Sequence, residues 1–292
     1  MTIGIYGTEF KQKFDRGIED LLKSLLKRDL DLMIYGPFKS YLSEKYDWIK
    51  ELGTFDSHEE VRDKIDLFFS IGGDGTFLST VSLIRDSLIP ILGINTGRLG
   101  FLSTVAVPGI EESLDKVLSG KYSIDKRSLV QLDLEDNPFG ETNYALNEIA
   151  VIKRDSSSMI VIHCEIDEEY LHAYWADGLL VSTPTGSTAY SLSCSGPIVH
   201  PDTDSFIINP IAPHHLNVRP MIVPDNVKIK LKADGREDQF LVTLDSRSAI
   251  INSGVDLHIS KAPFEIHMIN PEGHSFLSTM KNKLMWGMDK RN

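Results

Sequence analysis

The sequence predicts an α/β domain with a parallel sheet, followed by a strand-rich (all-β-like) domain. Short apolar runs alternate with stretches of helical spacing over the first hundred residues, which is typical of a parallel α/β sheet. After about Lys121, apolar residues recur at every second position, which indicates half-buried strands. The chain of 292 residues is long enough to form two such cores.

Four apolar runs mark the predicted strands of the first domain, at residues 3–6, 31–35, 67–71 and 89–94. Apolar residues at helical spacing over 14–26 predict a helix after the first strand. Phe77, Val81 and Ile84 predict another helix after the third strand. This order of strands and helices is what a parallel sheet requires, because each crossover needs a connecting helix.

Alternating apolar residues at 130–134, 160–166 and 227–231 predict strands of the second domain. Turn signals such as Asn137-Pro138 and Asp234-Gly235 separate them. We therefore place the α/β domain at 1–120 and the strand-rich domain at 121–272. A final helix at 276–286 is expected to return to the first domain, so that residues 273–292 belong with it.

Composition and charge narrow the classes of partner. The net charge of -12 disfavours nucleic acid and anionic membranes as partners. Residues 1–15 lack a basic segment followed by an apolar one, and no apolar run is long enough to cross a bilayer. The two cysteines form no CxxC motif. These features predict a soluble cytoplasmic protein, and its negative charge does not exclude an anionic small ligand.

The strongest local motif is Gly72-Gly73-Asp74-Gly75-Thr76, between the third strand and its helix. Glycines let a phosphate approach the backbone, and the start of a helix offers free N–H groups. The Asp74 carboxylate is able to accept the proton of a substrate hydroxyl, or to coordinate a metal ion that bridges phosphates. The alternative is a glycine-rich turn in which Asp74 only caps the helix. Neither GxGxxG nor a P-loop is present.

A second motif, residues 95–102 (NTGRLGFL), follows the fourth strand. Ligands of open α/β sheets bind beyond the carboxyl ends of the strands, so this loop and the GGDGT turn should share one edge of the sheet. A third motif, residues 183–190 (TPTGSTAY), offers hydroxyls, a glycine and a tyrosine that is able to stack on a base. Each motif also has a purely structural explanation. Residues 95–102 could form only a turn, and residues 183–190 could form only a capped helix start.

Two polar pairs stand out near predicted strands. Asn147-Glu148 lies in an otherwise apolar stretch, where an amide beside a carboxylate suits the edge of adenine or the hydroxyls of ribose. Asp177-Gly178 precedes the strand that leads to the third motif. Either pair is also explained as a solvated strand end.

Taken together, these segments resemble the NAD kinase family. The resemblance covers GGDGT at 72–76, the loop at 95–102, Asn147-Glu148, residues 177–193 (DGLLVSTPTGSTAYSLS) and residues 211–220. Lipid kinases and phosphofructokinases share GGDG, whereas the TPTGSTAYSLS run is specific. A lipid or sugar kinase and a catalytically silent nucleotide sensor stay open as alternatives.

The resemblance implies transfer of a phosphoryl group from ATP, or from another triphosphate or polyphosphate, to the adenosine 2′-hydroxyl of NAD, with Asp74 as the catalytic base. It implies a homodimer or homotetramer. Mg²⁺ is expected to arrive with the triphosphate, which normally carries it, and the sequence shows no cluster with metal-ligand spacing that would form a dedicated site. The implied NAD contacts are Asp74, Gly75, Asn147, Glu148, Asp177, Thr185, Thr188, Ala189, Tyr190, Ser191, Leu192, Ser193, Ala212 and Arg247. The implied phosphate contacts are Gly72, Gly73, Gly75, Thr76, Asn95 and Gly97.

The chain departs from the family pattern in three places. Ser195 stands where the family usually has glycine, so a positive φ there implies strain of ~1 kcal/mol. Ser246-Arg247 replaces the usual Gly-Gln and suggests a cation near a phosphate. Trp175-Ala176 precedes Asp177 at a place linked to the choice between NAD and NADH, and this leaves that choice open.

Overall fold

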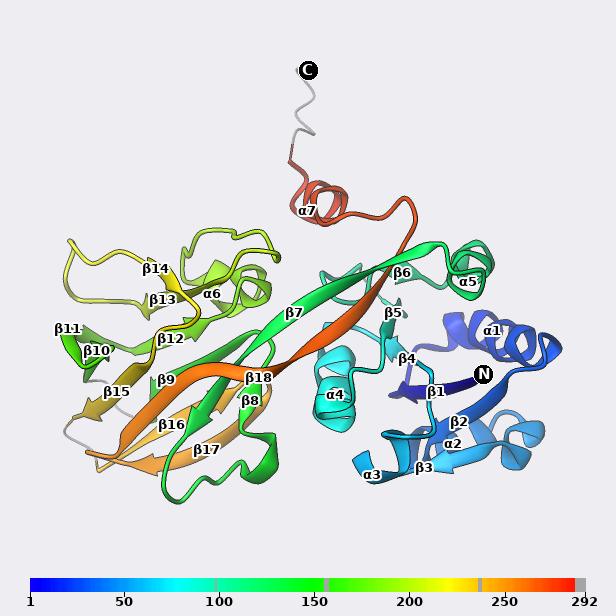
Figure 1. The fold of residues 1–292 in the computed structure, drawn as a ribbon, viewed down its shortest axis with the longest axis horizontal. Coiled ribbons are helices and arrows are strands. Elements are labelled where there is room, and N and C mark those ends of the chain that lie inside the picture. The colour runs from blue at the N-terminus through cyan, green and yellow to red at the C-terminus, as the bar shows by residue number, and fades with distance from the viewer. Residues whose placement is uncertain (98, 155–157, 236–237, 287–292) are drawn as a thin grey trace. The chain divides into compact units, whose positions relative to one another are not determined.

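The computed structural model describes residues 1–97, 99–154, 158–235 and 238–286. The chain divides into two compact units (Figure 1). The first joins Met1–Lys126 with the segment that begins at Ile266, and the second is Arg127–Glu265. Two strands, β7 (Tyr122–Asp133) and β18 (Asp256–Pro271), contain the boundaries between the units. No helix in the described ranges is long and apolar enough to cross a membrane.

The first unit is built on a parallel sheet with the strand order β5-β4-β1-β2-β3. β6 pairs with β5, and Met268 of β18 pairs in parallel with Ile91 of β5. The predicted parallel α/β sheet is therefore confirmed. The strands are β1 (Thr2–Gly7), β2 (Asp31–Tyr35), β3 (Gly53–Phe55), β4 (Leu67–Gly72), β5 (Ile91–Asn95) and β6 (Val105–Ala106).

Helices of the first unit bury apolar stripes against this sheet. In α1, Ile18, Leu21, Leu22 and Leu25 recur at helical spacing and are buried in one core with β1 and β4. We did not predict α2 from the sequence, because it begins at Gly36-Pro37, a pair that is typical of turns. Proline is nevertheless well suited to the first turn of a helix. The α-helices are α1 (Asp15–Lys27), α2 (Gly36–Ser43), α3 (His58–Val61), α4 (Asp74–Ile84), α5 (Ile110–Leu118) and α7 (Phe276–Leu284).

The second unit packs two antiparallel layers on one core. One layer has the order β14-β13-β12-β9-β16-β17, and the other contains β11-β10-β15 and the first part of β18. Phe206 and Val242 of the first layer share a core with Ile162 and Leu231 of the second. This arrangement confirms the predicted strand-rich domain and explains its alternating pattern, since one face of each strand is buried.

The strands of these two layers, the short strand β8 and two short helices lie in the second unit. They are β8 (Tyr144–Ala145), β9 (Glu148–Lys153), β10 (Ile160–Ile166), β11 (Glu169–Ala176), β12 (Gly178–Ser182), η5 (Thr185–Thr188), α6 (Tyr190–Ser193), β13 (Ser205–Ile211), β14 (Met221–Pro224), β15 (Ile229–Asp234), β16 (Gln239–Leu244) and β17 (Arg247–Asn252).

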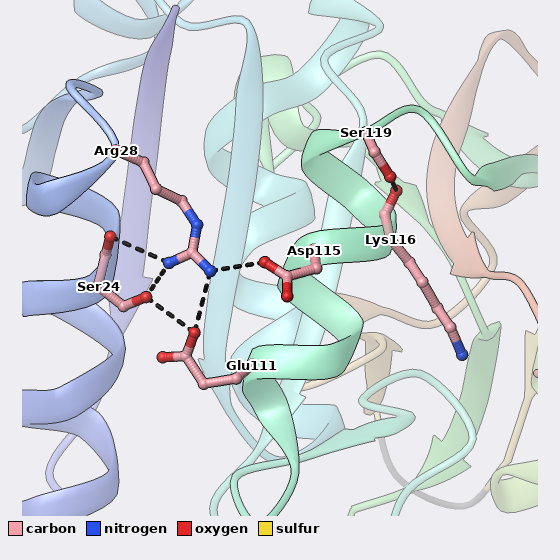
Figure 2. A network of polar contacts seen from close by, with 6 residues as sticks. All are labelled: Ser24, Arg28, Glu111, Asp115, Lys116 and Ser119. Carbon is pink, nitrogen blue, oxygen red and sulfur yellow. Dashed lines mark hydrogen bonds and ion pairs between the residues drawn. The ribbon is translucent and has the colours of Figure 1, made fainter.

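A polar network joins α1 to α5 (Figure 2). The Arg28 guanidinium lies between two carboxylates, with Nη2 2.6 Å from Asp115 Oδ1 and 3.1 Å from Glu111 Oε2. Ser24 donates to Glu111 Oε2 at 2.9 Å, and Arg28 Nη1 donates to the Ser24 carbonyl at 3.1 Å. Lys116 points away from this network. Arg28 thus ties the C-terminal turn of α1 to a neighbouring helix.

We expect Arg28→Ala to lower the free energy of unfolding by about 1 kcal/mol, because a charge network is worth more than an isolated exposed ion pair. Arg16→Ala is the matched control, since Arg16 lies on the same helix, is 93% exposed and is 3.9 Å from Asp20. Urea unfolding of both variants measures the difference. Equal stability of the two variants would show that the network contributes nothing.

Candidate active site

The GGDGT turn and the loop after β5 meet at one edge of the parallel sheet. Gly72 at the end of β4 pairs with Asn95 at the end of β5, and Thr96 donates to the Gly72 carbonyl at 3.1 Å. This confirms the predicted neighbourhood of the two motifs. A Cβ on Gly73 or Gly75 would meet no atom within 4 Å, so the backbone of the turn faces open space. Such a turn leaves room for a phosphate to approach closely.

Asp74 is the first residue of α4, but Gly73 is the N-cap and no side chain caps this helix. The Asp74 carboxylate instead accepts hydrogen bonds from the loop that follows β5. Its Oδ2 accepts from the Phe101 N–H at 3.0 Å, and its Oδ1 accepts from Leu102 at 3.0 Å and from Ser103 at 3.1 Å. The alternative in which Asp74 only caps its own helix is therefore wrong.

Glycine is required at position 100 by this carboxylate. A Cβ on Gly100 would lie 1.8 Å from Asp74 Oδ1, which no side chain can tolerate without movement. Nearer the strand, Gly97 donates to the Asn95 side chain at 2.7 Å in a local turn. Arg98 of the same motif lies outside the described residues. Helix α7 adds a residue that the sequence did not suggest, since Lys283 lies 3.5 Å from Asp74 Oδ2.

In the second unit, Asn147 lies between β8 and β9 and Glu148 is the first residue of β9, and both are buried. The backbone here is fixed by another carboxylate. Asp245 accepts from the N–H groups of Leu146 at 2.9 Å, Asn147 at 2.8 Å and Glu148 at 3.2 Å. Burial raises the pKa of Asp245, and these hydrogen bonds oppose the rise. Asp245 has a φ of 53°, in the left-handed region.

The Glu148 carboxyl group has a strongly raised pKa. Burial, and then the nearby Asp245, raise its pKa to about 8, and a hydrogen bond from the Tyr190 backbone opposes the rise. Its Oε2 has no hydrogen-bond partner among the described residues. A mostly protonated carboxyl at neutral pH can donate and accept, which suits a neutral polar ligand such as a hydroxyl group.

The TPTGSTAY motif packs directly on this pair. Thr183 Oγ1 donates to the Leu146 carbonyl at 2.6 Å and accepts from the Gly186 N–H at 3.2 Å. A Cβ on Gly186 would lie 2.1 Å from the Asn147 carbonyl oxygen, so only glycine allows the approach. The structure thus brings together two sequence motifs that lie about forty residues apart.

The end of this motif forms η5 and α6. Thr185 accepts from buried Arg127 at 3.2 Å, and Thr188 donates to the Thr185 carbonyl at 3.1 Å. The Asn209 side-chain amide donates to the Ser191 carbonyl at 3.0 Å. Tyr190 is 39% exposed, so its ring is accessible. Ala189, Leu192 and Ser193 lie in the same short segment.

The structure shows the conformation of two residues that depart from the family pattern, Ser195 and Arg247. Ser195 has a φ of 60°, so it adopts the strained conformation that its replacement of glycine implied. Arg247 directs its guanidinium to the backbone carbonyls of Thr142 and Tyr144 and lies over the Tyr144 ring. The Arg247 guanidinium is therefore bonded to backbone carbonyls of the second unit.

Asp177 and Ala212 lie beside each other at the ends of paired strands. The Asp177 N–H donates to the Ile211 carbonyl at 2.9 Å, and Ala212 follows with a φ of 45°. The Asp177 carboxylate forms an ion pair with Lys153 at 2.6 Å. A ligand that binds Asp177 must therefore share its carboxylate with this lysine.

We expect Glu148 to make stability fall as pH rises. Between its ordinary pKa of 4.5 and about 8, the folded chain keeps a proton that the unfolded chain releases. The wild type should therefore lose unfolding free energy relative to Glu148→Gln by up to about 1.4 kcal/mol per pH unit between pH 5 and 8. Urea unfolding at several pH values measures this difference, with the exposed Glu169→Gln as control. Parallel curves for the wild type and Glu148→Gln would refute the argument.

Comparison with known proteins covers both units. The family model described as the ATP-NAD kinase N-terminal domain matches residues 31–122, and that described as the ATP-NAD kinase C-terminal domain matches residues 146–271. The chain is 46% identical over 292 residues to the NAD kinase of Cytophaga hutchinsonii, with 100% of both chains covered. It is 40% identical over 291 residues to that of Bacteroides fragilis, again with 100% of both covered.

Two solved structures share the fold. The yeast NADH kinase complexed with NADH gives a TM-score of 0.88 at 22% identity, over 99% of this chain and 89% of that chain. The NAD kinase from Archaeoglobus fulgidus in complex with ATP gives a TM-score of 0.74 at 24% identity, over 98% of each chain. Together with the full-length identities and the two matched domains, these findings show that the chain belongs to the ATP-NAD kinase family.

Proposed function

We propose that this protein is an NAD kinase, which transfers the terminal phosphoryl group of ATP to the adenosine 2′-hydroxyl of NAD and forms NADP. The observation that carries the proposal is the Asp74 carboxylate, held at an open glycine turn at the carboxyl edge of a parallel sheet. Ligands of such sheets bind at this edge. Curated relatives that match over the full length are NAD kinases, which supports this substrate pair.

The proposed reaction depends on positioning. The 2′-oxygen attacks the terminal phosphorus in line, the bond from phosphorus to the ADP oxygen breaks, and ADP leaves. Asp74 orients the hydroxyl and takes its proton late in the transfer. Three backbone N–H groups fix the carboxylate, so little reorganisation is needed when the substrate arrives. Backbone N–H groups of the GGDGT turn, at Gly72, Gly73, Gly75 and Thr76, contact the phosphates, and Asn95 and Gly97 flank them.

Mg²⁺ enters with the triphosphate in this proposal. Asp74 is surrounded by N–H donors, so its carboxylate is better arranged for a hydroxyl than for a metal ion. Within the described ranges, no group of three His, Cys, Asp or Glu side chains is placed to hold a metal. We propose that phosphate oxygens supply ligands of the ion, whose role is to neutralise charge on the triphosphate.

Residues of the second unit are proposed to bind NAD. The Asn147 amide and the protonated Glu148 suit the adenosine moiety, because both can donate and accept hydrogen bonds. The accessible ring of Tyr190 suits stacking on a base. Asp177, Ala212, Arg247 and the segment from Thr185 to Ser193 complete the proposed set.

We also propose a homodimer or homotetramer in the cytoplasm. The second unit exposes Trp175, Leu216, Met221 and Ile222, of which Leu216 is 87% exposed. Exposed apolar side chains support an interface where they lie together on the surface. Both cysteines are free thiols, which is typical of a reducing compartment.

The decisive experiment is formation of NADP from NAD, ATP and Mg²⁺ by the purified protein. Product formation would establish the activity, and replacement of ATP by other triphosphates or by polyphosphate would define the donor. NAD binding without NADP formation would favour a nucleotide sensor. Absence of both would redirect the search to lipid and sugar acceptors.

We expect Asp74→Asn to lower NADP formation by ~100-fold or more, the scale of general acid–base catalysis, because an amide cannot take the proton. Asp63→Asn, at an exposed residue of the same unit, is the control and should keep full activity. Steady-state rates measure the effect, and circular dichroism checks that the variant is folded. Near-normal turnover of folded Asp74→Asn would remove Asp74 from the mechanism.

A further inference from the structure

Helix α7 brings a cation to the Asp74 carboxylate. Lys283 Nζ lies 3.5 Å from Asp74 Oδ2, and each of the two side chains is 33% exposed. The same ammonium lies 4.8 Å from the centre of the Phe101 ring, and the Phe101 N–H donates to the same oxygen. The carboxylate, the ring and the ammonium thus form one cluster.

The helix that carries Lys283 is well anchored. Ser275 and Ser278 form a capping box at its start, with both hydrogen bonds at 3.1 Å. Thr279 and Met280 are buried, and the Phe276 ring lies 6.4 Å from the Phe101 ring. Because the helix and Phe101 are both fixed, the contact between Lys283 and Asp74 follows from the packing of the first unit.

Electrostatics give this lysine a role in phosphoryl transfer. A triphosphate near Asp74 would place several negative charges beside a carboxylate, in a chain whose net charge is already -12. A nearby cation relieves this repulsion. An ammonium group has three donors and a flexible stem, so it can turn from a carboxylate oxygen to a phosphate oxygen over a short distance.

We propose that Lys283 is a further catalytic residue of this enzyme, an inference that rests on the function proposed above. In the free enzyme its ammonium pairs with Asp74 Oδ2. When the substrate hydroxyl takes that place, the ammonium donates to an oxygen of the phosphoryl group in transfer and neutralises its charge. Lys283 keeps its protons throughout, and the hydroxyl proton passes to Asp74.

The test compares Lys283→Ala, Lys283→Arg and Lys281→Ala in NADP formation. Removal of a charge-stabilising donor should lower kcat about 10- to 100-fold in Lys283→Ala and change the KM for NAD much less. Lys283→Arg keeps the charge and should stay within about tenfold of the wild type. Lys281→Ala is matched because Lys281 is exposed on the same helix, and it should stay within about twofold.

Addition of ethylammonium separates a chemical role from a structural one. It should restore part of the kcat of Lys283→Ala and leave Lys281→Ala unchanged, and both variants should melt at the wild-type temperature. If the wild type forms NADP while Lys283→Ala matches or exceeds its kcat, the proposal is wrong and the proposed function stands. If the wild type forms no NADP, both are wrong.

Discussion

The hydrogen bonds between Asp74 and the loop after β5 are the constraint on which the first unit's site depends. Three N–H groups, of Phe101, Leu102 and Ser103, converge on one carboxylate. Charge-assisted bonds of this kind are among the stronger ones in proteins. They join the turn after β4 to the loop after β5 at the edge where Gly72 and Asn95 pair. Gly100 must lack a side chain because the carboxylate occupies that space.

In the second unit, too, one aspartate carboxylate accepts three backbone N–H groups. Asp245, at the turn between β16 and β17, accepts three N–H groups at residues 146–148 and so fixes the backbone of Asn147 and Glu148. Thr183 and Gly186 then pack against this backbone. The consequence is chemical, since burial, and then the nearby Asp245, raise the pKa of Glu148 to about 8. Each unit therefore uses one aspartate to order the segment that carries the proposed contacts.

Much of the architecture follows from local pattern. The apolar runs at β1, β2, β4 and β5 and the helical spacing in α1 and α4 predicted a parallel α/β sheet, which the pairings confirm. Alternation at β10 and β15 likewise predicted the strand-rich unit. Helices α2 and α5 were not predicted, because α2 begins at a Gly-Pro pair and α5 is an amphipathic segment of only nine residues.

By itself, the sequence determined the two fold classes, the GGDGT and TPTGSTAY motifs and their places at strand ends. These are local properties, because glycines, hydroxyls and periodicity act over a few residues. Only the tertiary structure decided which groups each carboxylate meets. It directs Asp74 to N–H groups 27 to 29 residues away and to Lys283, and it turns Arg247 to the carbonyls of Thr142 and Tyr144. Such contacts depend on how distant segments pack, and no local pattern encodes them.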